Sequence, residues 1–191
     1  VLTFFVTALM LALAPGPDII FVLTQSALYG MRAGVATTLG LISGLCFHTT
    51  IVAVGVAGIF MTSPLAFTLL TVVGAAYLLY LAWLSFRAGA SMAHLQESRF
   101  LGYWGLYRRG VIMNITNPKV TLFFLAFLPQ FCAPERGSVA LQVMELGLLF
   151  MLAAFLVFTA VSALGGRLAH WFNSSPRGQM LMHRVAGLVF V

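Results

Sequence analysis

Long apolar runs, each close to the length of a membrane span, alternate with short polar connections along the whole chain. A helix needs about 20 apolar residues to cross the hydrocarbon region of a bilayer. Such runs cover residues 1–28, 35–60, 64–86, 111–131 and 141–164, and a sixth begins near residue 180 and is expected to be cut short. Because an open sheet cannot satisfy its backbone hydrogen bonds in lipid, these spans are predicted to be helical. The pattern predicts an all-α integral membrane protein with six transmembrane helices.

Basic residues are distributed unequally between the two sets of connections. The connections after the first, third and fifth runs hold eight arginines, whereas the opposite connections hold only Arg136; the eight are Arg32, Arg87, Arg99, Arg108, Arg109, Arg167, Arg177 and Arg184. Basic connections stay on the cytoplasmic side, so both termini are predicted to lie outside. Three spans per half then make two inverted three-helix repeats. We assign residues 1–87 to the first repeat, 88–105 to a polar cytoplasmic linker and 106–191 to the second repeat.

Composition narrows the class of protein further. Of the 191 residues, 61% are hydrophobic and 7% are charged, whereas a soluble domain carries about 25% charged residues. The formal charge of +6 comes from arginines placed between apolar runs rather than on one face, so we expect a lipid bilayer and no nucleic acid as partner. The four histidines are widely scattered and no phosphate-binding loop or hydrolase motif occurs. We therefore predict no enzyme activity, no catalytic residues, no metal and no cofactor.

Two of the apolar runs contain proline breaks with a charged residue directly after the proline. The first run reads Pro15-Gly16-Pro17-Asp18, and the fourth reads Asn117-Pro118-Lys119. A charged side chain at membrane depth costs about 2.5–3.5 kcal/mol on insertion scales, so it is rarely retained without a use. Paired breaks in corresponding spans of a repeated membrane protein indicate a transporter's binding site.

Proline suits the first position of a helix, so Pro17 and Pro118 can each start a half-helix inside the membrane. With inverted topology the two N-termini meet, and their partial positive charges favour an anion. Lys119 can bind a substrate carboxylate there and Asp18 a substrate ammonium, which predicts a small zwitterion such as an amino acid. Asn114, Asn117 and Gln130 are predicted to add hydrogen bonds. The alternative is a purely structural ion pair between Asp18 and Lys119.

His48 lies near the middle of the second run. Two interpretations stay open for this residue: a proton relay together with Asp18, or a hydrogen-bonded histidine in the packed interior. In the same run, Gly40 and Gly44 are spaced one helical turn apart and predict close helix packing, as does Gly55 further along.

At these residues the chain resembles the LysE/RhtB family of bacterial amino-acid exporters. The resemblance rests on an ordered set of motifs: Pro15-Gly16-Pro17-Asp18, Gly30-Met31-Arg32-Ala33-Gly34, Gly74-Ala75-Ala76-Tyr77-Leu78, Asn114-Ile115-Thr116-Asn117-Pro118-Lys119 and Phe127-Leu128-Pro129-Gln130-Phe131. The resemblance implies secondary-active export of an amino acid or derivative across the bacterial inner membrane, in exchange for protons. Ala14 departs from the Thr or Ser of many relatives and removes one hydroxyl from the predicted site. A homo-oligomer is left open.

The main rival is an intramembrane thiol–disulfide redox carrier, because six-helix thiol relays belong to a related superfamily. Such a carrier needs two cysteines in equivalent places of the two repeats. Cys46 lies in the second run and Cys132 at the end of the fourth, so the two cysteines are not equivalent.

Overall fold

The computed structural model describes residues 2–14, 16–62, 64–87 and 100–174, and every regular element within these ranges is helical. Pro15 and the predicted sixth span lie outside the described residues. In chain order the elements are α1 (Leu2–Leu13), α2 (Pro17–Tyr29), α3 (Met31–Thr62), α4 (Pro64–Arg87), α5 (Gly102–Ile115), α6 (Pro118–Leu122), the π-helix η1 (Phe123–Phe127), the 3₁₀ helices η2 (Leu128–Phe131) and η3 (Pro134–Arg136), and α7 (Val139–Ser174).

Two helices contain straight stretches long and apolar enough to cross a membrane: Met31–Gly55 in α3 and Val139–Arg167 in α7. Two bent pairs of helices are long and apolar enough when taken together, α1 with α2 at an angle of 58° and α5 with the segment Pro118–Phe131 at 48°. The described residues thus supply up to four spans. The predicted breaks were at Pro15-Gly16-Pro17 and Asn117-Pro118, and the described residues bend at both places, between α1 and α2 and between α5 and α6. Six spans and their inverted repeat remain predictions.

The fourth span begins earlier than its hydropathy predicted. Helix α5 starts at Gly102, nine residues before residue 111, so it takes in the last residues of the predicted linker as well as Arg108 and Arg109. Both arginines are exposed, and the Arg109 guanidinium lies 5.2 Å from the centroid of the Phe21 ring on α2. Arginines and aromatic residues lower the mean hydropathy of this turn, yet such side chains suit a helix end at a membrane surface.

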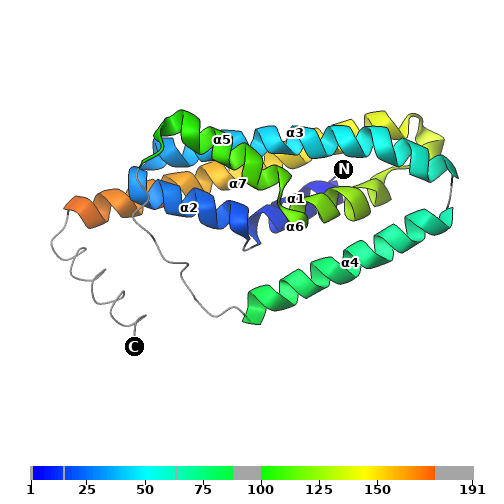
Figure 1. The fold of residues 1–191 in the computed structure, drawn as a ribbon, viewed down its shortest axis with the longest axis horizontal. Coiled ribbons are helices and arrows are strands. Elements are labelled where there is room, and N and C mark those ends of the chain that lie inside the picture. Colours follow the sequence, from blue (N-terminus) through cyan, green and yellow to red (C-terminus); the bar gives the residue numbers. More distant parts are fainter. Residues whose placement is uncertain (1, 15, 63, 88–99, 175–191) are drawn as a thin grey trace.

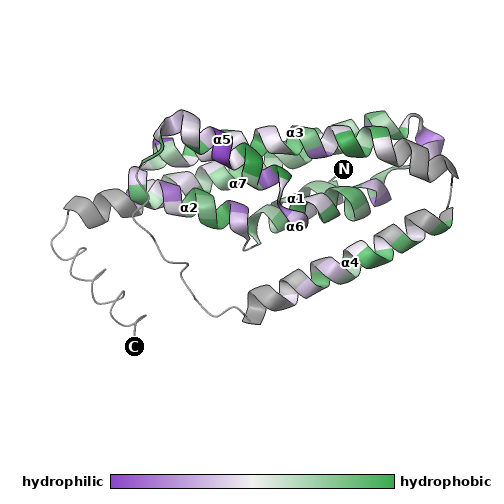
Figure 2. Cartoon of the chain, viewed as in Figure 1, coloured by the Kyte–Doolittle hydropathy of each residue, from purple (hydrophilic) through white to green (hydrophobic). Residues whose placement is uncertain are grey.

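Helix α3 packs against both α5 and α7, and α2 packs against α3 and α7 (Figure 1). Helix α4 lies apart from this bundle and contacts mainly η1. Apolar residues predominate along the described helices in the view of Figure 2, with scattered polar residues among them, which is the pattern of helices surrounded by lipid and by one another. Between α1, η1 and α7, the rings of Phe4, Phe123, Phe124 and Phe150 form a buried aromatic cluster, in which the closest centroids are 4.9 Å apart.

Glycines allow α3 and α5 to approach closely. A Cβ atom at Gly40 would overlap the carbonyl oxygen of Tyr107, and one at Gly44 would lie 2.7 Å from Cβ of Asn114. The predicted packing at these two glycines is confirmed. It is wrong for Gly55, where nothing lies within 4 Å of the added Cβ, because by that point α3 has passed the end of α5.

The two broken spans meet at their breaks. Helices α2 and α6 start next to each other and run in opposite directions along the bundle (Figure 1). Beyond α6 the second half-helix is irregular: it passes into the π-helix η1 and then into the 3₁₀ helix η2. A single π turn within a helix is rare and frequently occurs at functional sites.

Candidate functional site

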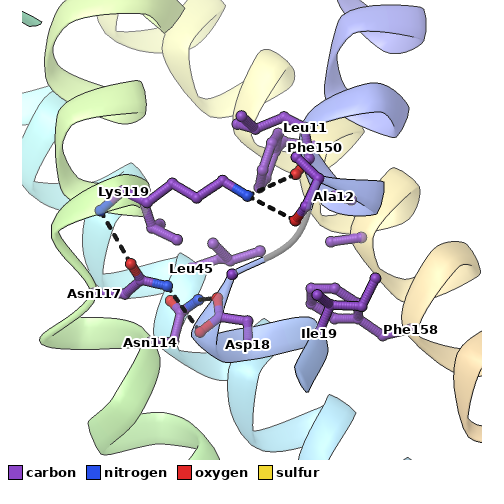
Figure 3. A pocket seen from close by; sticks show the side chains of 14 residues that line it. Leu11, Ala12, Asp18, Ile19, Leu45, Asn114, Asn117, Lys119, Phe150 and Phe158 are labelled. Carbon is purple, nitrogen blue, oxygen red and sulfur yellow. Dashed lines mark hydrogen bonds between the residues drawn. The ribbon is translucent and has the colours of Figure 1, made fainter. Parts of the chain in front are cut away.

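Asp18 is held by two amides from the opposite broken span. It is the second residue of α2, after Pro17, and only 8% of its surface is exposed. Nδ2 of Asn117 donates to Oδ1 of Asp18 at 2.9 Å, and Nδ2 of Asn114 donates to Oδ2 at 3.1 Å (Figure 3). Both oxygens of a buried carboxylate are thereby hydrogen-bonded, which offsets part of the cost of burying it.

Asn117 connects the two half-helices through one side chain. As the N-cap of α6, it accepts a hydrogen bond at Oδ1 from the backbone N–H of Lys119 at 3.0 Å. Its Nδ2 is the donor to Asp18 described above. Asparagine is among the preferred N-cap residues, and Pro118 at the first helical position has no N–H to satisfy. The residue that starts α6 therefore also fixes the start of α2.

The ammonium of Lys119 reaches the end of α1. Its Nζ donates to the carbonyl oxygens of Leu11 at 3.1 Å and Ala14 at 3.0 Å. The last carbonyls of a helix have no partner within the helix, and cations are favoured at this negative end. Within the described part of the chain, no ion pair joins Lys119 to Asp18; each charge is bonded to neutral groups instead. The two broken spans are tied, but through amides and carbonyls rather than through a direct ion pair.

Asp18 and Lys119 line one small pocket at the breaks, with Asn114 and Asn117 beside them (Figure 3). Its volume is about 30 Å³, which is room for water but not for an amino acid. The opposite wall is apolar and comes mainly from α3 and α7, with Leu45, Phe150, Ala154 and Phe158. The pocket combines one negative charge, one positive charge and an apolar surface.

A family model described as "LysE type translocator" matches residues 9–191. The chain belongs to the LysE family. Among its relatives, a homoserine/homoserine lactone efflux protein of Salmonella typhimurium is 34% identical over 190 residues, covering 98% of this chain and 90% of the relative. A leucine efflux protein of Salmonella choleraesuis is 28% identical over 193 residues, covering 99% and 90%. An uncharacterized membrane protein of Vibrio cholerae is 32% identical over 190 residues, covering 100% and 92%. No solved structure matches.

In this LysE-family chain His48 does not line the pocket itself but contacts Asn114, which does. His48 is buried, and its Nε2 lies 3.1 Å from the backbone carbonyl oxygen of Asn114. A carbonyl only accepts, so we assign the proton to Nε2 from this hydrogen bond. The Oδ1 atom of Asn114 is itself buried without a hydrogen-bond partner. Asn114 thus touches both His48 and Asp18, with its remaining acceptor unused.

Gln130 is not brought to the site. Its side chain is exposed on η2 and donates to the carbonyl oxygen of Ala126 at 2.7 Å, one turn back. It does not line the pocket.

The two cysteines are not paired with each other. Both are free: Cys46 is exposed on α3, and Cys132 is half-buried after η2. Burial raises the pKa of the Cys132 thiol to about 11, and a protonated thiol is a poor nucleophile for disulfide exchange. The geometry gives the redox carrier no support.

Sequence reasoning missed the carbonyl groups of Leu11 and Ala14 and the apolar wall from α3 and α7. One signal for the carbonyls was available, because a helix that ends inside a membrane leaves carbonyls that need donors. Nothing in the pattern marked Phe150 or Phe158, since α7 is apolar throughout.

Proposed function

We propose that this LysE-family protein exports an amino acid or a close derivative from the cytoplasm by proton antiport across a bacterial inner membrane. One observation carries the proposal: Asp18 and Lys119, about a hundred residues apart in sequence, lie in one pocket where two broken spans meet. Broken helices of this kind form the substrate sites of many secondary transporters. The names of the relatives support the direction of transport.

The chemistry of the pocket supports a zwitterionic substrate. The relatives are named for homoserine, homoserine lactone and leucine; all three have an α-amino group, and homoserine and leucine also have a free carboxylate. Here, Lys119 offers a cation for a carboxylate, and the wall with Leu45, Phe150 and Phe158 offers contact to a side chain. We place Gln130 outside this site.

The described conformation represents a closed state in this proposal. A pocket of about 30 Å³ cannot hold an amino acid, so the substrate enters only after the broken spans separate. Six spans in two inverted repeats, with both termini outside, would let the pocket open alternately to either side of the membrane. The breaks beside Gly16 and Asn117 are where we expect the motion.

We assign proton coupling to Asp18, with His48 in support. The carboxylate is buried among amide donors and is the acidic group that lines the pocket. His48 reaches it through Asn114, whose carbonyl and amide face the two titratable groups. Intramembrane acidic and histidine residues in such chains serve as proton relays in many transporters.

The test is uptake into inside-out proteoliposomes, which corresponds to export, with a panel of labelled amino acids and an imposed pH gradient. We expect at least one amino acid to accumulate only when the gradient is present. Asp18→Asn should fold, because Asn114 can rotate its amide and present the unused Oδ1 to the new donor. That variant should lose the response to the gradient, whereas Glu145→Gln, which neutralises an exposed acid on α7, should keep it. If no amino acid in the panel accumulates under a gradient, the proposed function is wrong.

A further inference from the structure

We propose that the carbonyl oxygens of Leu11 and Ala14 form the binding site for the α-ammonium of the substrate, and that the ammonium of Lys119 occupies this site when the transporter is empty. The inference rests on the proposed function and deepens it. It replaces the sequence-based expectation that Asp18 itself receives the substrate ammonium.

The geometry of the carbonyls is that of a site for an N–H cation. Two oxygens accept from a single nitrogen at 3.1 and 3.0 Å. They belong to the last turn of α1 and the residue after it, where the helix dipole places about half a negative charge. The pocket borders this helix end through Leu11, Ala12 and Ala14. An amino-acid ammonium carries three donors, and two of them could replace those of Lys119.

The break leaves room for the lysine side chain to reach these carbonyls and to withdraw. A Cβ atom at Gly16 would lie 3.4 Å from Nζ and 3.5 Å from Cδ of Lys119, so the bare glycine backbone borders the path of the side chain. The Cα of Lys119 is fixed in α6, across the pocket from α1, by the cap that Asn117 provides. Because its Cα is fixed and its side chain is flexible, Lys119 can move its ammonium without any movement of α1 or α6.

Asp18 is a less suitable partner for the substrate. Each of its oxygens already accepts a hydrogen bond from an asparagine amide, one at the end of α5 (Asn114) and one at the start of α6 (Asn117), so the carboxylate is held by both sides of the break. The carbonyls of α1, in contrast, are satisfied by a side chain that a carboxylate can attract. When a zwitterion enters, its carboxylate draws Lys119 away and its ammonium takes the vacated carbonyls. The hydrogen bonds to the carbonyls are then conserved in the empty and the loaded pocket.

The test measures the binding of an amine to the purified Lys119→Met variant of the whole chain. Binding is detected by the change in melting temperature during thermal unfolding in detergent. Ethylammonium, which has an ammonium but no carboxylate, should stabilise this variant saturably. At ten times its dissociation constant, the melting temperature should rise by about 3–5 °C. It should leave the wild type and Lys119→Arg unchanged, because their own cation fills the site. Tetramethylammonium, which has no N–H donor, should not stabilise Lys119→Met, and Arg136→Gln, which removes an exposed cation, should behave as the wild type.

A double variant separates the carbonyls from Asp18 as the site of the amine. In Asp18→Asn/Lys119→Met, ethylammonium should still raise the melting temperature, although less, because the carbonyls remain. Loss of the effect in the double variant, or an equal effect on wild type and Lys119→Met, would overturn the proposal. If Lys119→Met accumulates poorly, Lys119→Gln serves instead. Its neutral side-chain amide can donate to the carbonyls in the empty protein, and ethylammonium should displace it. This experiment measures binding alone. Its result can therefore be interpreted even if the transport assay detects no export.

Discussion

Asn117→Asp isolates the hydrogen bond that joins the two half-helices. Aspartate caps a helix about as well as asparagine. The new carboxylate can therefore still accept from the backbone N–H of Lys119, which lies 3.0 Å from Oδ1 of Asn117 in the wild type. The Nδ2 amide group of Asn117, which donates to Asp18 at 2.9 Å in the wild type, is replaced by an oxygen. The substitution therefore preserves the start of α6 and places two carboxylates against each other.

The magnitude follows from these two changes. A hydrogen bond to a charged group contributes about 1.5–3 kcal/mol. Two unit charges about 3 Å apart repel by about 5 kcal/mol at an effective dielectric constant near 20, and sharing a proton between the carboxylates reduces that repulsion. We expect Asn117→Asp to lose about 3–5 kcal/mol of unfolding free energy. In a chain of this size the loss lowers the melting temperature by roughly 10 °C.

The swap Asp18→Asn/Asn117→Asp should recover most of this loss. The amide introduced at position 18 can donate to the carboxylate introduced at position 117, and the oxygen of that amide can accept from Asn114, so every donor again faces an acceptor. We expect a coupling energy of at least about 2 kcal/mol in the double-mutant cycle, measured by thermal unfolding in detergent through tryptophan fluorescence. Ser138→Asp is the control, because it adds a carboxylate at an exposed position in the connection before α7. A swap no more stable than Asn117→Asp alone would refute the bridging role of this hydrogen bond.

Three further outcomes are expected. Gly44→Ala should lower the unfolding free energy by about 1–3 kcal/mol and reduce export, because its Cβ would lie 2.8 Å from Oδ1 of Asn114; Gly55→Ala, with nothing within 4 Å, should do neither in the same melting and transport assays. Single cysteines placed at Ser91 and Ser138 in a cysteine-free background should label from opposite sides of intact cells, and labelling of both from one side would contradict the predicted topology. Burial raises the pKa of the Cys132 thiol to about 11, so in a Cys46→Ser background its labelling by iodoacetamide should accelerate roughly tenfold per pH unit from pH 7 to 10; a plateau near pH 9 would contradict this.

The meeting of Asp18 and Lys119 could be predicted because it depends on few facts. Each follows a helix-starting proline midway through an apolar run, and opposed topology brings two such points together. The hydrogen bonds that hold them could not be predicted in the same way. A backbone carbonyl has no signature in the sequence, so the bonds from Lys119 to Leu11 and Ala14 depend on the bend between α1 and α2.

The fold could be predicted only in part from the sequence, for a similar reason. Hydropathy located the broken spans, but it placed the start of the fourth at residue 111, because Arg108, Arg109 and their aromatic neighbours lower the average without ending the helix. Gln130 was expected to add a hydrogen bond at the site, but even in a regular α-helix it would lie about 16 Å along the axis from Lys119. Passage through η1 and η2 changes the number of residues per turn, so a residue twelve positions beyond Pro118 no longer faces where an α-helix would place it.

The π turn also bears on how the two halves of the chain can be aligned. Asp18 and Lys119 are both second residues of their half-helices, and an alignment anchored on them pairs α2 with α6 as far as Leu122. From Phe123 to Phe127 each backbone bond spans one residue more than in an α-helix, so the second half-helix contains an additional residue that the first does not. An ungapped alignment beyond that point compares residues on different helix faces. Any internal duplication in this chain should therefore be sought with a one-residue gap after position 122.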